Sequence, residues 1–399
     1  MTDLGASTDD ATRLQRVLDE IDRRNREASV LVKELFLEPS HRWPSIVSGD
    51  ERYWDAAVIK RLLEQADLDY DTNPLRGLLL TDMAADACER LRIQDRDVPS
   101  LRYTAYKERS TYQRRFGRFT NALSDIDAAE SALHSGDPSL GSVQRATLHY
   151  ARALVYAEPD FWQPERAIQL LDEAEPVFLA ASPERARAAV FLRGAVYERS
   201  GNVYAALRIW HALAESAESE SGDYADVARS IAACYAVLGQ VQQAGQWCDE
   251  ALRLNAQRGM TSVSYSKALL VQGHVLSAME RYLDALGAYT QSEQMFSAFG
   301  MEDTALRVAL AGIRVRLLID SAADVRARLV ELANRSAALD VKEKHRRPHV
   351  TAEAFDYLRR YSESQPVTVD VVVFVERFLD DITSRAVYRF VAPIPPRVM

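Results

Sequence analysis

The chain has 399 residues, of which 47% are apolar and 27% charged, and its formal net charge is −9. This composition excludes wholesale disorder, and the acidic balance argues against a general nucleic-acid binder, because phosphate contacts need clustered Lys and Arg. Only 16 glycines and 14 prolines are present. That is few for the tight turns of a sandwich, barrel or propeller, so the composition predicts a mostly helical protein.

Targeting and redox signals are sparse. The N-terminus is polar and acidic, with neither a basic n-region nor an apolar h-region, so we expect no signal peptide. No window approaches 18 uncharged apolar residues, so we expect no membrane span. The cysteines Cys88, Cys234 and Cys248 lie far apart and form no CxxC pair, which argues against a disulfide framework or structural zinc. We therefore predict a cytoplasmic protein.

The first part of the chain is expected to be a disordered tail, residues 1–8, followed by an N-terminal helical region, residues 9–97. Residues 9–37 carry a heptad-like apolar stripe interrupted by Arg24 and Asn25. We favour a helix that packs on its own chain, and an intermolecular coiled coil is the alternative, so the oligomeric state stays open. The stripe consists of Leu14, Val17, Leu18, Ile21, Ala28, Leu31, Val32 and Leu35.

Two further amphipathic helices are predicted in this region. Residues 39–50 contain Trp43-Pro44 and Gly49-Asp50 and are expected to form a loop. Residues 53–65 and 75–91 have helical periodicity and are separated by a turn-forming stretch that ends at Pro74. They are expected to form a degenerate first helical hairpin.

From residue 98 to about residue 340, one pattern recurs. A small residue is followed three positions later by an aromatic residue or Leu, then four later by Gly, then five later by Ala. The clearest copies are Gly194, Tyr197, Gly201, Ala206, then Ala232, Tyr235, Gly239, Ala244, then Gly273, Leu276, Glu280, Ala285. The anchor alanines 122, 167, 206, 244 and 285 lie 45, 39, 38 and 41 residues apart.

This spacing has a mechanical meaning. The small residue and the aromatic share one face of a first helix, and the glycine ends that helix in a left-handed conformation. The anchor alanine allows a second helix to approach the first closely. Each unit is then a helical hairpin that cannot bury its own apolar face, so the hairpins stack into an array.

The pattern resembles the tetratricopeptide repeat (TPR) family, most fully at residues 232–251. The period near 40 is longer than the 34 residues of the standard repeat. The resemblance implies an all-α protein, an α-solenoid of stacked antiparallel helix hairpins that forms a TPR-like superhelix and is preceded by an N-terminal helical region. It covers about residues 98–340.

In the TPR family, the first helices of the hairpins line a concave groove. The resemblance therefore implies a set of groove-facing residues, of which most charged members are basic. They suggest an electropositive groove for an acidic peptide or chain terminus, although Lys and Arg are also common on exposed helix faces. The implied partner-binding residues are Lys107, Thr111, Arg114, His149, Arg152, Tyr156, Arg229, Lys267 and His274.

The C-terminal part follows a basic break at residues 341–349. Helices near residues 351–363 and 367–384 are expected to cap the array within residues 341–391. Alternating valines at 367–375 are also compatible with a strand, but a lone strand would lack a partner in a helical chain. Residues 392–399, which include Pro393 and Pro395, are expected to be an extended tail, and a polyproline ligand is the alternative.

Catalytic and metal-binding motifs are absent from the sequence. There is no Walker A loop, GxGxxG, HExxH or GxSxG. His345 and His349 have the spacing of a metal pair on a helix, but Pro348 lies between them. We therefore predict a non-enzymatic protein without metal or cofactor.

Together these patterns predict a protein–protein interaction scaffold, adaptor or regulator that binds a peptide or partner protein. The layout also resembles bacterial regulators in which an N-terminal helical region precedes long-period repeats that sense signal peptides and change the shape of the superhelix. An enzyme with a cryptic site is the third possibility. Membrane and nucleic-acid partners are not expected.

Overall fold

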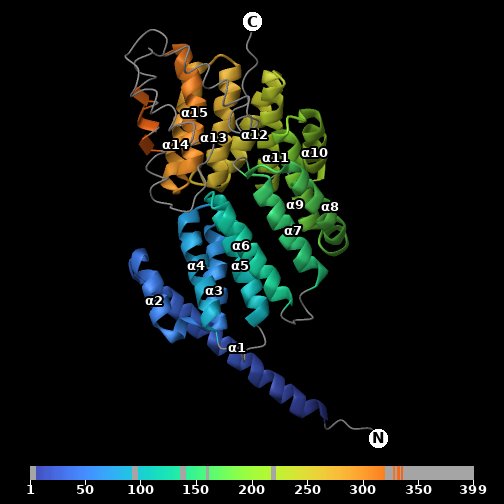
Figure 1. Cartoon of the computed structure of the whole chain (residues 1–399), viewed down its shortest axis with the longest axis vertical. Helices are drawn as coiled ribbons and strands as arrows, with labels where there is room; N and C mark the ends of the chain where they lie inside the picture. Colours follow the sequence, from blue (N-terminus) through green and yellow to red (C-terminus); the bar gives the residue numbers. More distant parts are fainter. Residues whose placement is uncertain are drawn as a thin grey trace. The chain divides into compact units, whose positions relative to one another are not determined.

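The fold is described from a computed structural model. It describes residues 6–91, 98–134, 141–158, 161–216, 222–319, 327–328, 330–332 and 334–335. Within these ranges all regular structure is helical (Figure 1). The expected C-terminal helices and tail of residues 341–399 lie outside the described residues.

Contacts divide the chain into two compact units. Unit 1 contains Met1–Gln113 and Ser124–Gly141, and unit 2 contains Arg114–Leu123 and Ser142–Met399. The division runs through the helices α5 (Val98–Arg115) and α6 (Phe119–His134), downstream of the border at residue 97 expected from the repeats. The two units are described separately below.

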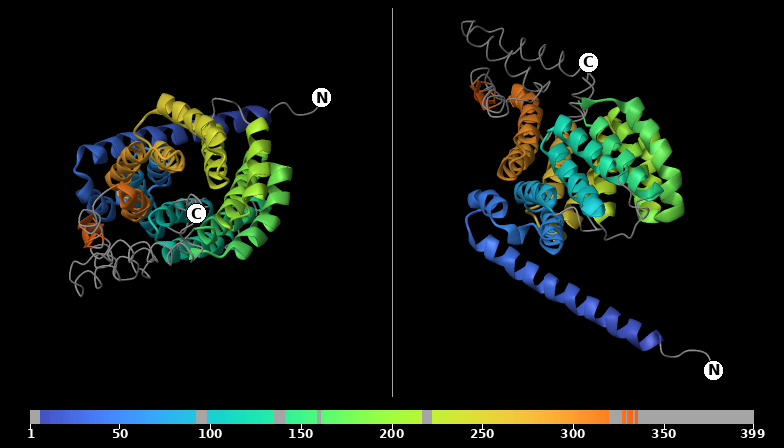
Figure 2. Two further views of the ribbon diagram at one scale, coloured as in Figure 1. Left: turned by 90° about the horizontal axis from the view of Figure 1, so that it is seen from above. Right: turned by 60° about the horizontal axis from the view of Figure 1, so that its bottom comes forward.

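Unit 1 begins with the 32-residue helix α1 (Ala6–Leu37), so residues 6–8, expected in a disordered tail, are helical. The second half of the apolar stripe is buried at Ala28, Val32 and Leu35, against α3 (Ala56–Asp69). In the first half, Val17 and Ile21 are about half exposed. Figure 2 shows this first half, the blue end of the helix, extending beyond its neighbours in unit 1. The helix α1 therefore packs against its own chain, as expected, only from Ala28 onwards.

The segment expected to be a loop is instead mostly helical. It contains the 3-10 turn η1 (Ser40–Arg42), the helix α2 (Trp43–Gly49) and the 3-10 turn η2 (Glu51–Tyr53). Pro44 lies in the first turn of α2, where its missing N–H is not needed. Trp43 and Val47 are four residues apart and both buried, so α2 has an apolar face that periodicity over a longer window did not reveal.

The next two helices of unit 1 form the predicted hairpin. α3 and α4 (Pro74–Arg90) pack against each other. Asp55 caps α3 by accepting a hydrogen bond from the Ala57 N–H, and Asn73 caps α4 in the same way. The carboxylate of Asp69, at the end of α3, forms a bidentate ion pair with Arg76 of α4. Polar side chains thus fix both ends of the turn between the two helices.

The described part of unit 2 contains nine consecutive helices from α7 onwards. Each contacts its neighbours along the chain, and the helices coloured green to orange follow a curved path in Figure 2. They are α7 (Ser142–Tyr156), α8 (Pro164–Ala181), α9 (Pro183–Arg199), α10 (Val203–Ser216), α11 (Gly222–Val237), α12 (Val241–Arg258), α13 (Val263–Ala278), α14 (Tyr282–Ala298) and α15 (Glu302–Ile319). The predicted fold class, an all-α array of stacked hairpins, is confirmed.

The repeat register read from the sequence agrees with the packing. All five anchor alanines, at positions 122, 167, 206, 244 and 285, are 0% exposed, and each lies on the second helix of a pair. The glycines that end the first helices, Gly117, Gly201 and Gly239, have positive φ angles of 70°, 78° and 71°. Glu280 takes the same place in the next pair with φ 61°. The structure therefore has closely approaching helices and left-handed helix ends at the predicted positions.

Candidate functional site

The partner-binding residues implied by the sequence do not all lie in one unit. Lys107 and Thr111 belong to the part of α5 in unit 1. Lys107 forms an ion pair with the adjacent Glu108, and the Thr111 hydroxyl donates to the Lys107 carbonyl. The other residues implied by the resemblance belong to unit 2.

In unit 2, a partly buried carboxylate interacts with basic groups from helices far apart in the chain. Glu158 follows α7, and its side chain is 19% exposed. It forms an ion pair with Arg114 and lies in the electrostatic field of Arg199 and Arg307. Burial raises the pKa of Glu158, but the three arginines together outweigh burial and hold that pKa below its ordinary value. The carboxylate is therefore charged at neutral pH.

Backbone and apolar contacts hold these groups in place. The Arg199 guanidinium at the end of α9 donates to the Ala157 carbonyl at 2.5 Å. Phe116, two residues after Arg114, packs against an apolar cluster contributed by α13, α14 and α15. Arg307 lies on α15, one of the helices that this contact joins to the segment following Arg114.

A second carboxylate extends the group. Burial raises the pKa of Glu198 above its ordinary value, and the opposing charges of Arg229 and Arg199 only partly offset that effect. Arg229 also lies 3.4 Å from the carboxylate of Asp226 on the same helix, α11. We call these residues the charge cluster, and its members are Arg114, Glu158, Glu198, Arg199, Asp226, Arg229 and Arg307.

The charge cluster contains two of the predicted residues, Arg114 and Arg229. Both interact with carboxylates of the same chain. Their side chains are only 15% and 18% exposed. The surface around them therefore combines both charge signs. Reversing the charge of Arg114 would place a second carboxylate beside Glu158, so this substitution would disturb the fold as well as any partner contact.

The remaining predicted residues have individual surroundings. His149 Nδ1 lies 3.0 Å from the carboxylate of Glu173 on α8. Tyr156 stacks on Phe161 with ring centroids 6.0 Å apart, and Arg166 lies over the tyrosine ring. Arg152 is half-buried on α7, and Lys267 is exposed on α13.

His274 does not face a groove. Its side chain is 5% exposed, and its Nδ1 lies 2.7 Å from the Tyr289 hydroxyl, between α13 and α14. In this structure the His274 side chain therefore lies in the contact between α13 and α14. Its sequence neighbours Gly273 and Val275 are buried as well.

Sequence reasoning left Glu158, Arg199 and Arg307 out of the site. Glu158 lies in the long connection after α7, where the spacing between anchor alanines rises to 45 residues, outside the repeat register. Arg307 lies beyond the last anchor alanine. Arg199 lies at the end of α9, and neither it nor the adjacent Glu198 is among the partner-binding residues implied by the sequence.

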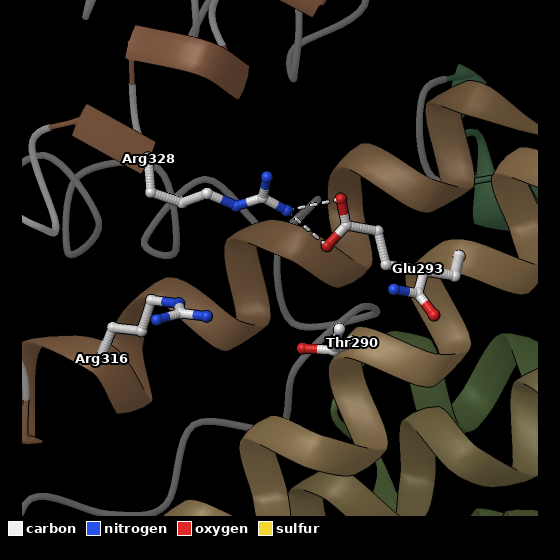
Figure 3. Close-up of a pocket in the computed structure, with 5 residues that line it drawn as sticks. Thr290, Glu293, Arg316 and Arg328 are labelled. Atoms are coloured by element: carbon white, nitrogen blue, oxygen red, sulfur yellow. Dashed lines mark hydrogen bonds and ion pairs between the residues drawn. The ribbon is translucent and has the colours of Figure 1, made fainter.

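A second polar feature of unit 2 is a cavity of about 420 Å³ lined by Thr290, Glu293, Gln294, Arg316 and Arg328. Figure 3 shows the Arg328 guanidinium directed at the Glu293 carboxylate, 2.6 Å away. Arg335 contacts the same carboxylate at 2.5 Å and also pairs with Glu302. The guanidinium groups of Arg328 and Arg335 thus already form ion pairs with carboxylates of the chain, so we assign no ligand to this cavity.

The described residues contain no grouping of three or more His, Cys, Asp or Glu side chains suited to hold a metal ion. His345 and His349 lie outside the described part of the chain. None of the described helices is long and apolar enough to cross a membrane.

The chain matches no protein-family model and no curated protein sequence. Solved structures do resemble it. A Rap protein complexed with Competence and Sporulation Factor superposes with a TM-score of 0.52 at 14% identity, covering 92% of this chain and 99% of Rap. The apo form of the quorum sensor NprR from B. thuringiensis gives 0.47 at 14% identity, covering 90% and 99%. A signal transduction ATPase with a tetratricopeptide repeat sensor from Pyrococcus horikoshii gives 0.45 at 13% identity, covering 91% and 52%.

The similarity to Rap confirms the predicted TPR-like fold. The match to Rap extends over nearly the full length of both chains. The chain therefore has a TPR-like all-α fold similar to that of the Rap protein.

Proposed function

We propose that this protein is a cytoplasmic, bacterial, non-enzymatic regulator that binds a peptide, or a short segment of a partner protein, beside the charge cluster of unit 2. The observation that carries the proposal is the cluster itself. Glu158 pairs with Arg114 of α5 and lies in the electrostatic field of arginines from α9 and α15, although partly buried ion pairs contribute little net stability compared with apolar packing. Charges fixed in this way suit specific recognition.

The fold supports this proposal. The matched Rap structure is a complex with Competence and Sporulation Factor, so an array of this type accommodates a bound factor. By analogy, the ligand of this chain contacts the faces of the odd-numbered helices, where Arg152, Tyr156 and Lys267 accompany the cluster. Because the cluster presents both signs, a ligand with an acidic group next to a basic one fits better than a purely acidic peptide.

Hydrogen exchange tests this assignment. Short synthetic peptides that are acidic, basic or of mixed charge are added to the full-length protein, and backbone exchange is followed by mass spectrometry. We expect a mixed-charge peptide to slow exchange in α7, α9, α11 and α13. Protection confined to the N-terminal helices of unit 1, or no protection by any peptide class, would contradict the proposal.

A scaffold and a sensor differ in how they respond. In a sensor, peptide binding changes the shape of the array, whereas a scaffold barely responds. Small-angle scattering of the full chain with and without the bound peptide separates the two cases. We expect a change in the radius of gyration, since the half-buried cluster links residues from distant helices and a ligand that competes for Arg114 would alter those links.

A single substitution provides the matched control. Lys267 is exposed, so Lys267→Glu should weaken binding of the acidic part of the peptide without changing the thermal midpoint. Arg281→Glu, on the exposed N-terminus of α14, changes charge equally away from the cluster and should leave binding intact. Equal binding by both variants would remove Lys267 from the site.

A further inference from the structure

A groove of about 490 Å³ lies between α12 and α14, over α13. Figure 1 shows α13 between these two helices. Val275 and Leu276 of α13 and Cys248 of α12 line it, and Gly245 and Ala288 form parts of its walls. Asp249 lies at its edge. We call this the α12–α14 groove.

The preceding groove of the array, between α10 and α12 over α11, is filled. His211 of α10 lies with its ring centroid 5.9 Å from that of Trp247 on α12. The imidazole Nε2 is 3.0 Å from the hydroxyl of Tyr235 on α11. Leu207, Tyr235 and Trp247 belong to one apolar cluster. An indole, a phenol and an imidazole thus occupy the space between two second helices of consecutive hairpins.

The repeat register relates the two grooves position by position. Counting from the anchor alanines, Leu207 corresponds to Gly245, His211 to Asp249, and Trp247 to Ala288. Counting from the helix ends at Gly239 and Glu280, Tyr235 corresponds to Leu276. At each of these four positions the later groove has a smaller side chain. The α12–α14 groove is therefore open because the residues that fill its neighbour are replaced.

The side chains that are replaced in the α12–α14 groove indicate which ligand groups would fit there. The missing volume is mostly aromatic. The apolar part of the remaining lining consists of Val275, Leu276, Met279 and Leu283, and the polar side chains of Gln272 and Gln291 also line the groove. The imidazole position is taken by Asp249, an exposed carboxylate that makes no hydrogen bond or ion pair with the described residues. Asp284 at the opposite edge already pairs with Arg281 at 2.7 Å. An aromatic ring next to an N–H donor or a cation would restore both the packing and the polar contact.

We propose that the α12–α14 groove is a docking site for a partner protein segment that inserts a tryptophan side chain, with a neighbouring Lys or Arg directed at Asp249. Tryptophan carries a large apolar area at low conformational cost, and such anchors dominate the affinity of many interfaces. The basic neighbour matches the carboxylate edge. This site is separate from the charge cluster and does not depend on the peptide proposed above.

The test uses two synthetic tetrapeptides, acetyl-Gly-Trp-Lys-Gly-amide and its Trp-to-Ala counterpart, with the full-length protein. A fluorine label on the indole ring allows binding to be followed by ¹⁹F NMR despite the protein's own tryptophans, and calorimetry compares the two peptides. We expect the Trp peptide to bind at least about tenfold more tightly, the ratio typical of an anchor residue.

Filling the groove provides the decisive variant. Ala288→Trp restores the residue found in the preceding groove and should weaken binding of the Trp peptide at least about tenfold. Tyr204→Trp adds an indole at a position that is 71% exposed and outside the groove, so it should bind as the wild type does. If Ala288→Trp does not fold, Gly245→Leu takes its place, since the added Cβ meets only the flexible end of Met279, at 3.0 Å. Asp249→Asn should weaken binding and reduce its salt dependence.

Three results would overturn the proposal. The first is equal affinity for the Trp and Ala peptides, and the second is unchanged binding by a folded groove-filling variant. The third is a dimer in sedimentation that dissociates in the groove-filling variant, which would assign the groove to a second copy of the chain.

Discussion

Glu280 has a backbone conformation that side-chain-bearing residues rarely adopt. It ends α13 with φ 61°, where the preceding hairpins use Gly201 and Gly239. Its Cβ is crowded by its own backbone in this region, whereas glycine has no such contact. The residue is exposed, so its side chain adds no packing that would offset this cost.

Glu280→Gly should therefore stabilise the protein, by up to about 1 kcal/mol, because relief of the left-handed strain exceeds the added flexibility of the unfolded chain. Chemical denaturation measures the change. Glu280→Ala, which keeps a Cβ, is the control and should not stabilise. A destabilised Glu280→Gly would show that the α13–α14 turn differs from those of its neighbours.

For the anchor alanines we predict destabilisation when a larger side chain is introduced. Ala244 is 0% exposed on α12, so Ala244→Leu should overpack the α11–α12 contact and cost about 1–3 kcal/mol of unfolding free energy. Gln242→Leu, at an exposed position of the same helix, should change stability little. An unchanged thermal midpoint for Ala244→Leu would mean that the repeat register is wrong.

The pKa of Glu158 links the charge cluster to stability. Since this pKa lies below its ordinary value of 4.5, the ionised carboxylate stabilises the folded state at neutral pH. This contribution is lost as pH falls from the ordinary pKa through the lower folded pKa. Glu158→Gln leaves the arginines without their carboxylate and should cost about 3 kcal/mol at pH 7.

Urea unfolding at several pH values measures this effect. The difference in unfolding free energy between wild type and Glu158→Gln should be constant near neutrality and shrink below the ordinary Glu pKa. Glu198→Gln should behave differently, because burial raises the pKa of Glu198 and its ionised form does not stabilise the fold. A constant difference for Glu158→Gln down to the acid unfolding transition would exclude a stabilising role for its charge.

At the scale of elements, α1 shows how one helix can be half core and half surface. The apolar stripe runs along the helix with an interruption at Arg24 and Asn25, and its buried residues lie only between Ala28 and Leu35. Helix propensity and i,i+4 ion pairs such as Arg23–Glu27 support the uncovered half. The apolar periodicity predicted the helix correctly but did not show which part of it packs against other helices.

Two truncations separate the halves of α1. Leu35 is 1% exposed, so Leu35→Ala should cost about 2–5 kcal/mol. Ile21 is 47% exposed, so Ile21→Ala should change the free energy of unfolding of the monomer little. Denaturation at two protein concentrations makes the measurement. A concentration-dependent loss for Ile21→Ala would instead favour the intermolecular coiled coil.

At the scale of the whole molecule, packing between consecutive helices is the main feature of the array. Each of the helices α7 to α15 packs against the next one along the chain, and the described residues hold no metal-type cluster. The three cysteines are buried, and burial raises the pKa of Cys88 and Cys248 to about 12. Neutral thiols of this kind are poor metal ligands and poor nucleophiles.

Prolonged chelation should therefore leave the helical circular dichroism and the thermal midpoint unchanged. The same protein treated with buffer alone is the control. A loss of helix that added zinc restores would reveal a metal site beyond the described residues, with His345 and His349 as the first candidates.

The sequence by itself determined the helical class, the hairpin register and the five anchor alanines, because close helix approach and left-handed helix ends demand particular residues at fixed spacing. Only the tertiary structure decided which charges meet. Glu158 and Arg307 lie about 150 residues apart in a chain whose repeats are about 40 residues long, and no local spacing connects them. The buried position of His274 and the open α12–α14 groove have the same origin. Both depend on side chains of neighbouring helices, which a repeat pattern aligns in sequence but does not bring into contact.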